Sequence, residues 1–246
     1  MKRSMTSNYN RGDYEAALEC VLSMETQITI AMGRNNAVYA SCLNNLALMH
    51  KCLGNHTDAM DAYTEALHKY EDLAGKKNTS YAATLANMGV LFKTMAEKSK
   101  GMDKLQLLER SEEALKDALA LRVELSGPES KEAMNSQIQV ASILNMRAKT
   151  EEAEKLLNET LKTARKKFGP SDTLCATVLN NLGLMKKNQK DYASAREFYE
   201  EALKIRTTAL GDQHPETVVS MHNLAELHLA AGNTKEMAEL QNKVGA

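Results

Sequence analysis

The feature that most constrains the fold is a sequence repeat of 42 residues. One aligned apolar position recurs at spacings of 42, 52, 42 and 42 residues, and its members are Leu46, Met88, Val140, Leu182 and Leu224. A separate series of glycines has the same four spacings: Gly33, Gly75, Gly127, Gly169 and Gly211. The agreement places a 10-residue insertion in one repeat. Because self-similarity at a period of about 20–50 residues indicates stacked structural units, we predict a repeat architecture.

Each unit is predicted to be a helical hairpin. The glycines of the second series follow helical patterns, where a left-handed residue closes the helix. Pro128 and Pro170 come directly after two of them as stop signals, and Gly54 and Gly232 mark turns between helices. With only 3 prolines and 12 glycines, and with Ala, Leu, Glu, Lys and Met abundant, the chain is predicted to be almost wholly helical.

The repeats are predicted to form one domain over residues 1–246. It begins with a partial repeat at residues 1–33, and the following repeats cover residues 37–75, 80–127, 131–169, 172–211 and 216–246. The insertion lies near residues 97–110, where we expect longer helices or a protruding turn. We expect its apolar side chains to contact the bundle, namely Met102, Leu105 and Leu108. Such an insertion could be tolerated variation or a contact specific to one partner.

The pattern within a repeat resembles a known family. In the first complete repeat the positions are Leu46, Ala47, His50, Gly54, Ala59, Tyr63 and Ala66. In the fourth they are Leu182, Gly183, Lys186, Lys190, Ala195, Tyr199 and Ala202. The order of large apolar, small, ring-like, glycine, alanine, aromatic and alanine resembles the tetratricopeptide repeat, from which His50, Lys186 and Lys190 depart.

The period and the connector at residues 209–227 are similar to the tandem repeats of kinesin light chains and their relatives. This resemblance covers residues 12–244 and implies an all-α fold, a right-handed α-solenoid of antiparallel helix hairpins. The subclass occurs in cargo adaptors, signalling regulators and assembly factors, so the resemblance implies protein binding without fixing the role.

A carboxamide stands directly before each aligned apolar residue. The five are Asn45, Asn87, Gln139, Asn181 and Asn223. At 3.6 residues per turn they lie on the side of the first helix away from its partner, which stacking turns into a concave wall. Because a carboxamide both donates and accepts, such a ladder can pair with the backbone of an extended peptide. The resemblance implies the same role, since tetratricopeptide families that bind peptides commonly use asparagine here.

Peptide binding is not the only role that the ladder could have. The carboxamides could bond the neighbouring repeat and hold the stack together, or they could be solvated residues inherited from a duplicated ancestor. Two further asparagines, Asn44 and Asn180, could extend the groove or bond across repeats.

A second series follows six residues after each carboxamide and contains three lysines: Lys51, Lys93 and Lys187. They could attract an acidic peptide to the rim of the groove, or they could form an ordinary solvated face. Elsewhere the predicted wall carries mostly Ala, Ile, Leu, Val, Ser and Asn. It lacks the basic side chains needed to grip the free carboxylate tail of heat-shock chaperones, so that ligand is not expected.

Bulk properties narrow the range of partners and locations. The balance of 31 basic and 32 acidic residues gives no reason to expect nucleic acid or acidic membranes as partners. No apolar run is long enough to insert in a membrane, and the first ten residues lack the apolar core of a secretory signal. The four cysteines have no C-x-x-C spacing and look like small buried apolar residues. We expect a cytoplasmic protein, although an imported organellar protein without its presequence would look the same.

No catalytic motif stands out. The chain has no G-x-S-x-G elbow, phosphate-binding glycine loop or H-E-x-x-H pair, and its six histidines are scattered. We therefore expect no catalytic residue, no metal and no cofactor. The prediction is a non-enzymatic scaffold or adaptor that binds an extended, acidic peptide in its concave groove. The alternative is an architectural or assembly-factor subunit of a larger complex, such as an organellar one, bound through its convex face, its ends or the insertion.

Overall fold

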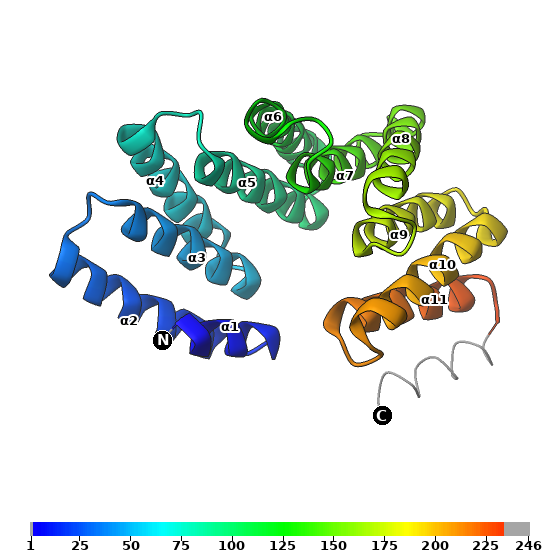
Figure 1. Ribbon diagram of the computed structural model, residues 1–246, viewed down its shortest axis with the longest axis horizontal. Helices are drawn as coiled ribbons and strands as arrows, with labels where there is room; N and C mark the ends of the chain where they lie inside the picture. Colours follow the sequence, from blue (N-terminus) through cyan, green and yellow to red (C-terminus); the bar gives the residue numbers. More distant parts are fainter. Residues whose placement is uncertain (1, 234–246) are drawn as a thin grey trace. The chain divides into compact units, whose positions relative to one another are not determined.

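The computed structural model describes residues 2–233, and this part of the chain is helical apart from short connectors (Figure 1). It contains no strand, which confirms the all-α prediction. Its helices are α1 (Lys2–Asn10), α2 (Tyr14–Met32), α3 (Ala37–Leu53), α4 (His56–Ala74), α5 (Thr79–Lys98), α6 (Gly101–Ser126), α7 (Lys131–Met146), α8 (Thr150–Phe168), α9 (Thr173–Asn188), α10 (Tyr192–Leu210) and α11 (Pro215–Ala230).

The chain divides into two compact units, Met1–Pro128 and Glu129–Ala246. The first holds α1–α6, and the described part of the second holds α7–α11. Within each unit, the two helices of a hairpin pack together, and first helices of neighbouring hairpins also contact each other in the pairs α3–α5, α7–α9 and α9–α11. Each unit is therefore a helical-repeat solenoid. The second helix expected for the last repeat lies outside the described residues.

Equivalent caps begin equivalent helices. The side chains of Asn36 and Asn78 accept hydrogen bonds from the amides of Tyr39 and Tyr81, in the first turns of α3 and α5. Such caps satisfy amides that lack a partner inside the helix. At the other end of α3, Gly54 takes the left-handed conformation (φ 81°), and its amide donates to the last carbonyls of the helix. These signals fix where each first helix begins and ends.

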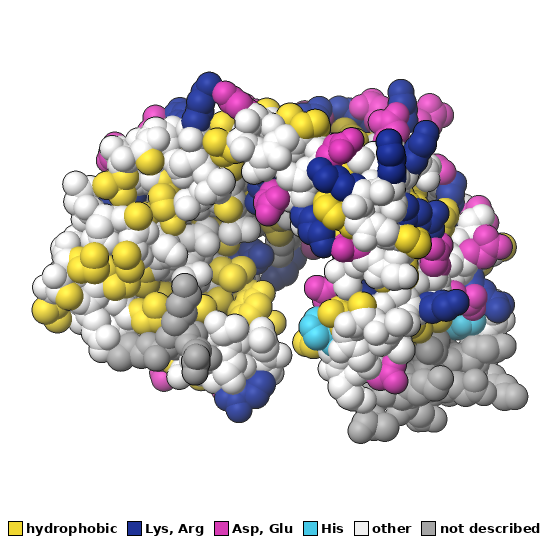
Figure 2. Space-filling view, viewed as in Figure 1, with side chains coloured by type: hydrophobic (Ala, Val, Ile, Leu, Met, Phe, Trp, Pro, Cys, Tyr) yellow, Lys and Arg dark blue, Asp and Glu magenta, His cyan; other side chains and the backbone are white. Residues whose placement is uncertain are grey.

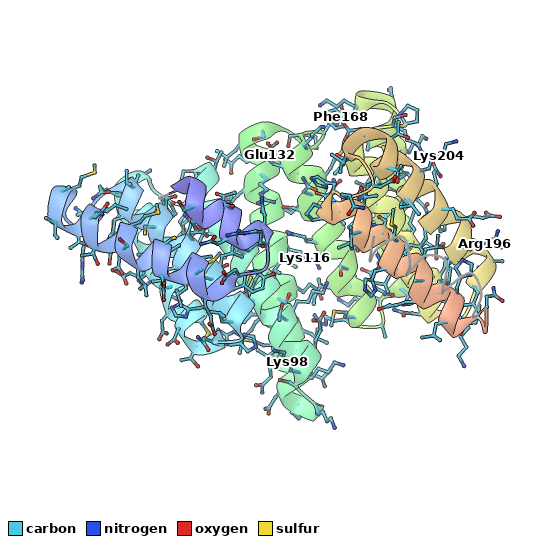
Figure 3. All side chains as sticks on the ribbon, turned by 90° about the horizontal axis from the view of Figure 1, so that it is seen from below. Lys98, Lys116, Glu132, Phe168, Arg196 and Lys204 are labelled. Carbon is cyan, nitrogen blue, oxygen red and sulfur yellow. The ribbon has the colours of Figure 1, made fainter. Side chains whose placement is uncertain are left out.

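The insertion lengthens both helices of one hairpin. Helix α5 has 20 residues against 17 in α3, and α6 has 26 against 19 in α4, which together account for all ten added residues. In Figure 3, Lys98 marks the tip of this longer hairpin. Leu108 is buried as expected, but Met102 (68% exposed) and Leu105 (54% exposed) are not in the bundle, so that expectation was wrong for these two. The added turns thus leave these two side chains largely exposed to solvent.

Small residues let the two helices of a hairpin approach closely. A Cβ atom added at Gly183 in α9 would lie 2.7 Å from the ring of Tyr199 in α10, and one added at Gly89 in α5 would lie 2.8 Å from the Leu115 side chain in α6. Tyr199 is fully buried by this contact. The small-then-aromatic pattern of the sequence is thus the packing pattern of the hairpin.

The sequence also predicted buried cysteines and no membrane-spanning helix. All four cysteines are free thiols, and Cys42 and Cys175 are buried as expected, whereas Cys20 and Cys52 are only partly buried. Among the described helices, none combines the length and apolar character needed to cross a membrane.

Candidate functional site

The predicted carboxamides lie on the first helix of successive hairpins, in α3, α5, α7, α9 and α11. All five are partly buried: Asn45, Asn87, Gln139, Asn181 and Asn223. Within each unit, we call the face that bears them the first-helix wall of that unit. Two of its carboxamides belong to the first unit and three to the second, and the two units are considered separately.

In the first unit, one carboxamide is used to join repeats. The side-chain nitrogen of Asn87 in α5 donates to the side-chain oxygen of Asn44 in α3 at 3.2 Å. Asn45 makes no side-chain hydrogen bond to any described residue, although it is partly buried. The inter-repeat role therefore holds for Asn87 and Asn44, and Asn45 is the carboxamide of this unit with its hydrogen-bonding groups available.

In the second unit, the asparagines have other partners. Asn180 is 8% exposed, and its nitrogen donates to the Ser220 hydroxyl in α11 at 3.1 Å. The Asn181 nitrogen donates to the Thr177 carbonyl of its own helix at 2.9 Å. Within the described chain, the side-chain oxygens of Asn180 and Gln139 are buried without a hydrogen-bond partner. Asn223 makes no side-chain hydrogen bond to any described residue.

Arg206 of α10 organises this second cluster, and it was not among the predicted site residues. Its side chain is 6% exposed, and its guanidinium donates to Ser220 at 2.8 Å, to the Glu216 carbonyl at 3.1 Å and to Thr177 at 3.2 Å. Burial lowers the pKa of Arg206, and the neighbouring Glu216 carboxylate opposes that shift. The repeat alignment offered a signal for this position, because Arg206 aligns with an aromatic residue, Tyr70 of α4. Tyr70 is buried in the structure.

The three predicted lysines differ in their partners. Lys187 in α9 forms an ion pair with Glu226 in α11, with 2.9 Å between ammonium and carboxylate oxygen. Lys93 also has an interaction partner. Lys51 in α3 is partly buried and pairs with no carboxylate in the described part of the chain, and burial lowers its pKa. Lys51 is thus the lysine of the first-helix wall whose charge has no acidic partner.

The more conspicuous basic surface lies elsewhere. Figure 2 shows Lys and Arg side chains gathered over α8, whose last turn holds Arg165, Lys166 and Lys167. Two of these are already paired, Arg165 with Glu201 and Lys167 with Glu129. Because α8 is a second helix, this basic region is not part of the first-helix wall. Among the residues described, no group of three or more His, Cys, Asp or Glu side chains could hold a metal ion.

The described helices form antiparallel hairpins that pack on one another within each unit. This architecture is that of helical-repeat solenoid proteins. Family models of the tetratricopeptide repeat match residues 40–79 and 174–244. Both segments are tetratricopeptide repeats, as predicted. A search of curated proteins finds no match. Membership of the 42-residue-period subclass stays a prediction.

Solved structures with the same fold cover most of the chain. BtubC (BKLC) from P. vanneervenii has 19% identity and a TM-score of 0.66, covering 99% of this chain and 89% of its own. A putative kinesin light chain from Podosopora anserina has 17% identity and a TM-score of 0.60, covering 85% and 94%. NprR in complex with its cognate peptide NprX has 13% identity and a TM-score of 0.61, covering 97% of this chain and 66% of its own. At these identities the likeness shows the fold.

Proposed function

We propose that this protein is a non-enzymatic interaction scaffold that binds an extended, acidic peptide along the first-helix wall of its first unit. The observation that carries the proposal is the pair Asn45 and Lys51 on α3. Both are partly buried, neither has a carboxylate or side-chain hydrogen-bond partner among the described residues, and they lie on one helix within two turns of each other. Burial of polar and charged groups without partners is costly, so a ligand that supplies those partners is stabilised there.

The family supports a protein ligand. Tetratricopeptide repeats are generally non-enzymatic interaction modules, and NprR, which has the same fold, is described in complex with its cognate peptide. In the proposed complex, the Asn45 carboxamide pairs with a backbone N–H and C=O of the peptide, and the lysines of the wall attract acidic side chains of the peptide. Asn223 is the candidate for a backbone contact in the second unit. Asn87, Asn180 and Asn181 contribute less because their nitrogens are already bonded.

Isothermal titration with a defined probe tests this proposal. The acidic probe peptide is a synthetic peptide of alternating glutamate and serine, and the control peptide has glutamine in place of every glutamate. We expect the acidic probe peptide to bind more tightly, and Asn45→Ala to weaken it about fivefold through loss of one hydrogen-bonding side chain. Asn181→Ala is the matched control, because the Asn181 nitrogen already bonds its own helix. Equal affinities for the two peptides, or unchanged binding by folded Asn45→Ala, would sink the groove proposal.

An architectural role in a larger complex is the second candidate. It is favoured by the exposed Met102 and Leu105, which are three residues apart and therefore neighbours on the surface of α6. Exposed apolar side chains of this kind mark contact surfaces when they are contiguous. Native purification distinguishes the two candidates: co-elution at fixed stoichiometry with a large complex supports the subunit, and exchangeable partners at variable stoichiometry support the scaffold.

A further inference from the structure

Lys51 and Lys187 occupy the same repeat position, five residues after Leu46 and Leu182 respectively. In the second unit, Lys187 is 19% exposed, and its ammonium lies 2.9 Å from the carboxylate of Glu226. Glu226 stands on α11, the first helix of the next hairpin, 39 residues further along the chain. The second unit therefore supplies an acidic partner for this lysine from its own sequence.

The first unit has a different residue at the corresponding place. The residue 39 positions after Lys51 is Val90, on α5. Helix α3 contacts α5 just as α9 contacts α11, so the two helix pairs are equivalent. Val90 is partly buried and carries no charge. Where the second unit holds a carboxylate beside its lysine, the first unit holds an apolar side chain.

With Val90 in place of a carboxylate, the partly buried ammonium of Lys51 has no opposite charge beside it from α5. An ammonium that is partly removed from water is stabilised by a nearby carboxylate and destabilised without one. The direction of the Lys51 pKa agrees, because burial lowers it and no carboxylate raises it. About two helical turns before Lys51, the Asn44–Asn87 hydrogen bond ties α3 to α5. The helix that bears the lysine is thus bonded to the helix that bears Val90.

We infer that Lys51, bordered by Val90, is an anchor for a glutamate or aspartate side chain of the bound peptide, and that Glu226 occupies the equivalent anchor in the second unit. This inference rests on the proposed function and assigns the acid-binding position within it. The Lys187–Glu226 pair shows the arrangement that a ligand carboxylate adopts at Lys51, on the side of the next first helix. Glu226 is thereby an intramolecular competitor that keeps acidic ligands away from Lys187.

Exchanging the two residues tests the inference. In Val90→Glu the first unit gains its own carboxylate, and we expect the acidic probe peptide to bind about tenfold more weakly. Val90→Gln is the matched control, with similar size and no charge, and is expected to change the affinity less than about threefold. Glu226→Val exposes Lys187 and is expected to strengthen binding about threefold. The glutamine control peptide should not respond to any of these changes.

A further variant covers the case in which Val90→Glu does not fold. Lys51→Met keeps the apolar stem and removes the charge, and it should abolish the preference for the acidic probe peptide over the control peptide. If the wild type prefers the acidic probe peptide, and Val90→Glu and Lys51→Met bind that peptide as tightly as the wild type does, the anchor is wrong and the proposed function survives. If neither the wild type nor Glu226→Val prefers the acidic probe peptide, both proposals are overturned.

Discussion

The helices α3, α4 and α5 of the first unit and α9, α10 and α11 of the second stand at equivalent repeat positions, but different side chains join them. In the second unit, Arg206 of α10 reaches Thr177 on α9 and Ser220 on α11. In the first unit, Tyr70 of α4 occupies the position of Arg206 and interacts with Ser80 and Ser41. Burial raises the pKa of Tyr70, and these hydroxyls offset part of the rise.

This difference shows that the side chain joining two hairpins affects the hydrogen bonds of the neighbouring asparagines. Ser220 accepts hydrogen bonds from both Arg206 and Asn180, so the charged link also draws Asn180 into the core of the second unit. With Tyr70 in its place, the aligned asparagine, Asn44, instead bonds Asn87 on the wall. The repeat position of Arg206 and Tyr70 therefore determines where two hairpins are joined. The residue type at that position determines which asparagines form hydrogen bonds near the joint.

Removal of Arg206 should give the largest loss of stability. Arg206→Met retains an apolar stem but leaves the hydroxyls of Thr177 and Ser220 without their guanidinium partner, and we expect a loss of about 3 kcal/mol in the free energy of unfolding. Urea denaturation followed by circular dichroism measures it, and Arg196→Met on the exposed face of the same helix is the control. A loss below about 1 kcal/mol would show that Arg206 does not hold the second unit together.

Gly183→Ala should give the next largest effect. The added methyl group would lie 2.7 Å from the buried ring of Tyr199, and we expect a net loss of about 2 kcal/mol in spite of the better helix propensity of alanine. The neighbouring Leu184→Ala, at a position 41% exposed, should cost clearly less. Thermal unfolding of both variants compares them, and a Gly183→Ala variant as stable as the wild type would mean that the ring can move.

Tyr70→Phe should cost less than loss of Arg206. It removes only the hydroxyl that interacts with Ser80 and Ser41, so a loss of about 1 kcal/mol is expected from the same urea experiment. The ratio of the two losses in the free energy of unfolding compares the neutral contact of the first unit with the charged contact of the second. If Tyr70→Phe and Arg206→Met are equally destabilising, the neutral and charged links are equivalent and the contrast between them fails.

The smallest expected effect is the pH dependence of the Lys187–Glu226 pair. The hydrogen bond from Lys187 lowers the pKa of Glu226 below its ordinary value of 4.5. The carboxylate therefore contributes stability that is present above that value and is lost as pH falls through the lower pKa of the folded protein. Glu226 is 58% exposed, so the contribution is about 0.5 kcal/mol or less.

Chemical denaturation of the wild type and Glu226→Gln over the acidic range isolates this contribution. The wild type should be slightly more stable near neutral pH, and the two curves should converge as the carboxylate is protonated. A constant difference between the curves would contradict the assignment of the shift to Glu226.

The sequence predicts much of the fold because local signals determine the helix ends. The glycine series predicted the hairpins, and the caps at Asn36 and Asn78 stand where the first helices were expected to begin. The division of the insertion between α5 and α6 was not predictable, because longer helices and a protruding turn satisfy the same composition. Met102 and Leu105 were misjudged because apolar character alone does not say whether a neighbour is present to cover it.

The candidate site was less predictable than the fold. Helical periodicity placed the carboxamides and lysines on the first helices, but their partners depend on which residues face them from the next repeat. Asn87 meets Asn44, whereas Asn180 meets Ser220, and neither choice follows from the spacing alone. Glu226 was also missed as the partner of Lys187, although its position two residues after the aligned Leu224 can be compared with that of Val90 after Met88.

The longer α5–α6 hairpin has a practical consequence. Seven residues make about two helical turns, so the added length in α6 returns the helix to nearly the same face. Below the insertion, Leu115 still packs on Gly89 and the Ser111 hydroxyl still donates to the Gly89 carbonyl at 2.7 Å. The tip is therefore a natural attachment point for a fluorescent reporter, where a dye on Met102→Cys would sample solvent without disturbing the hairpin base or the wall.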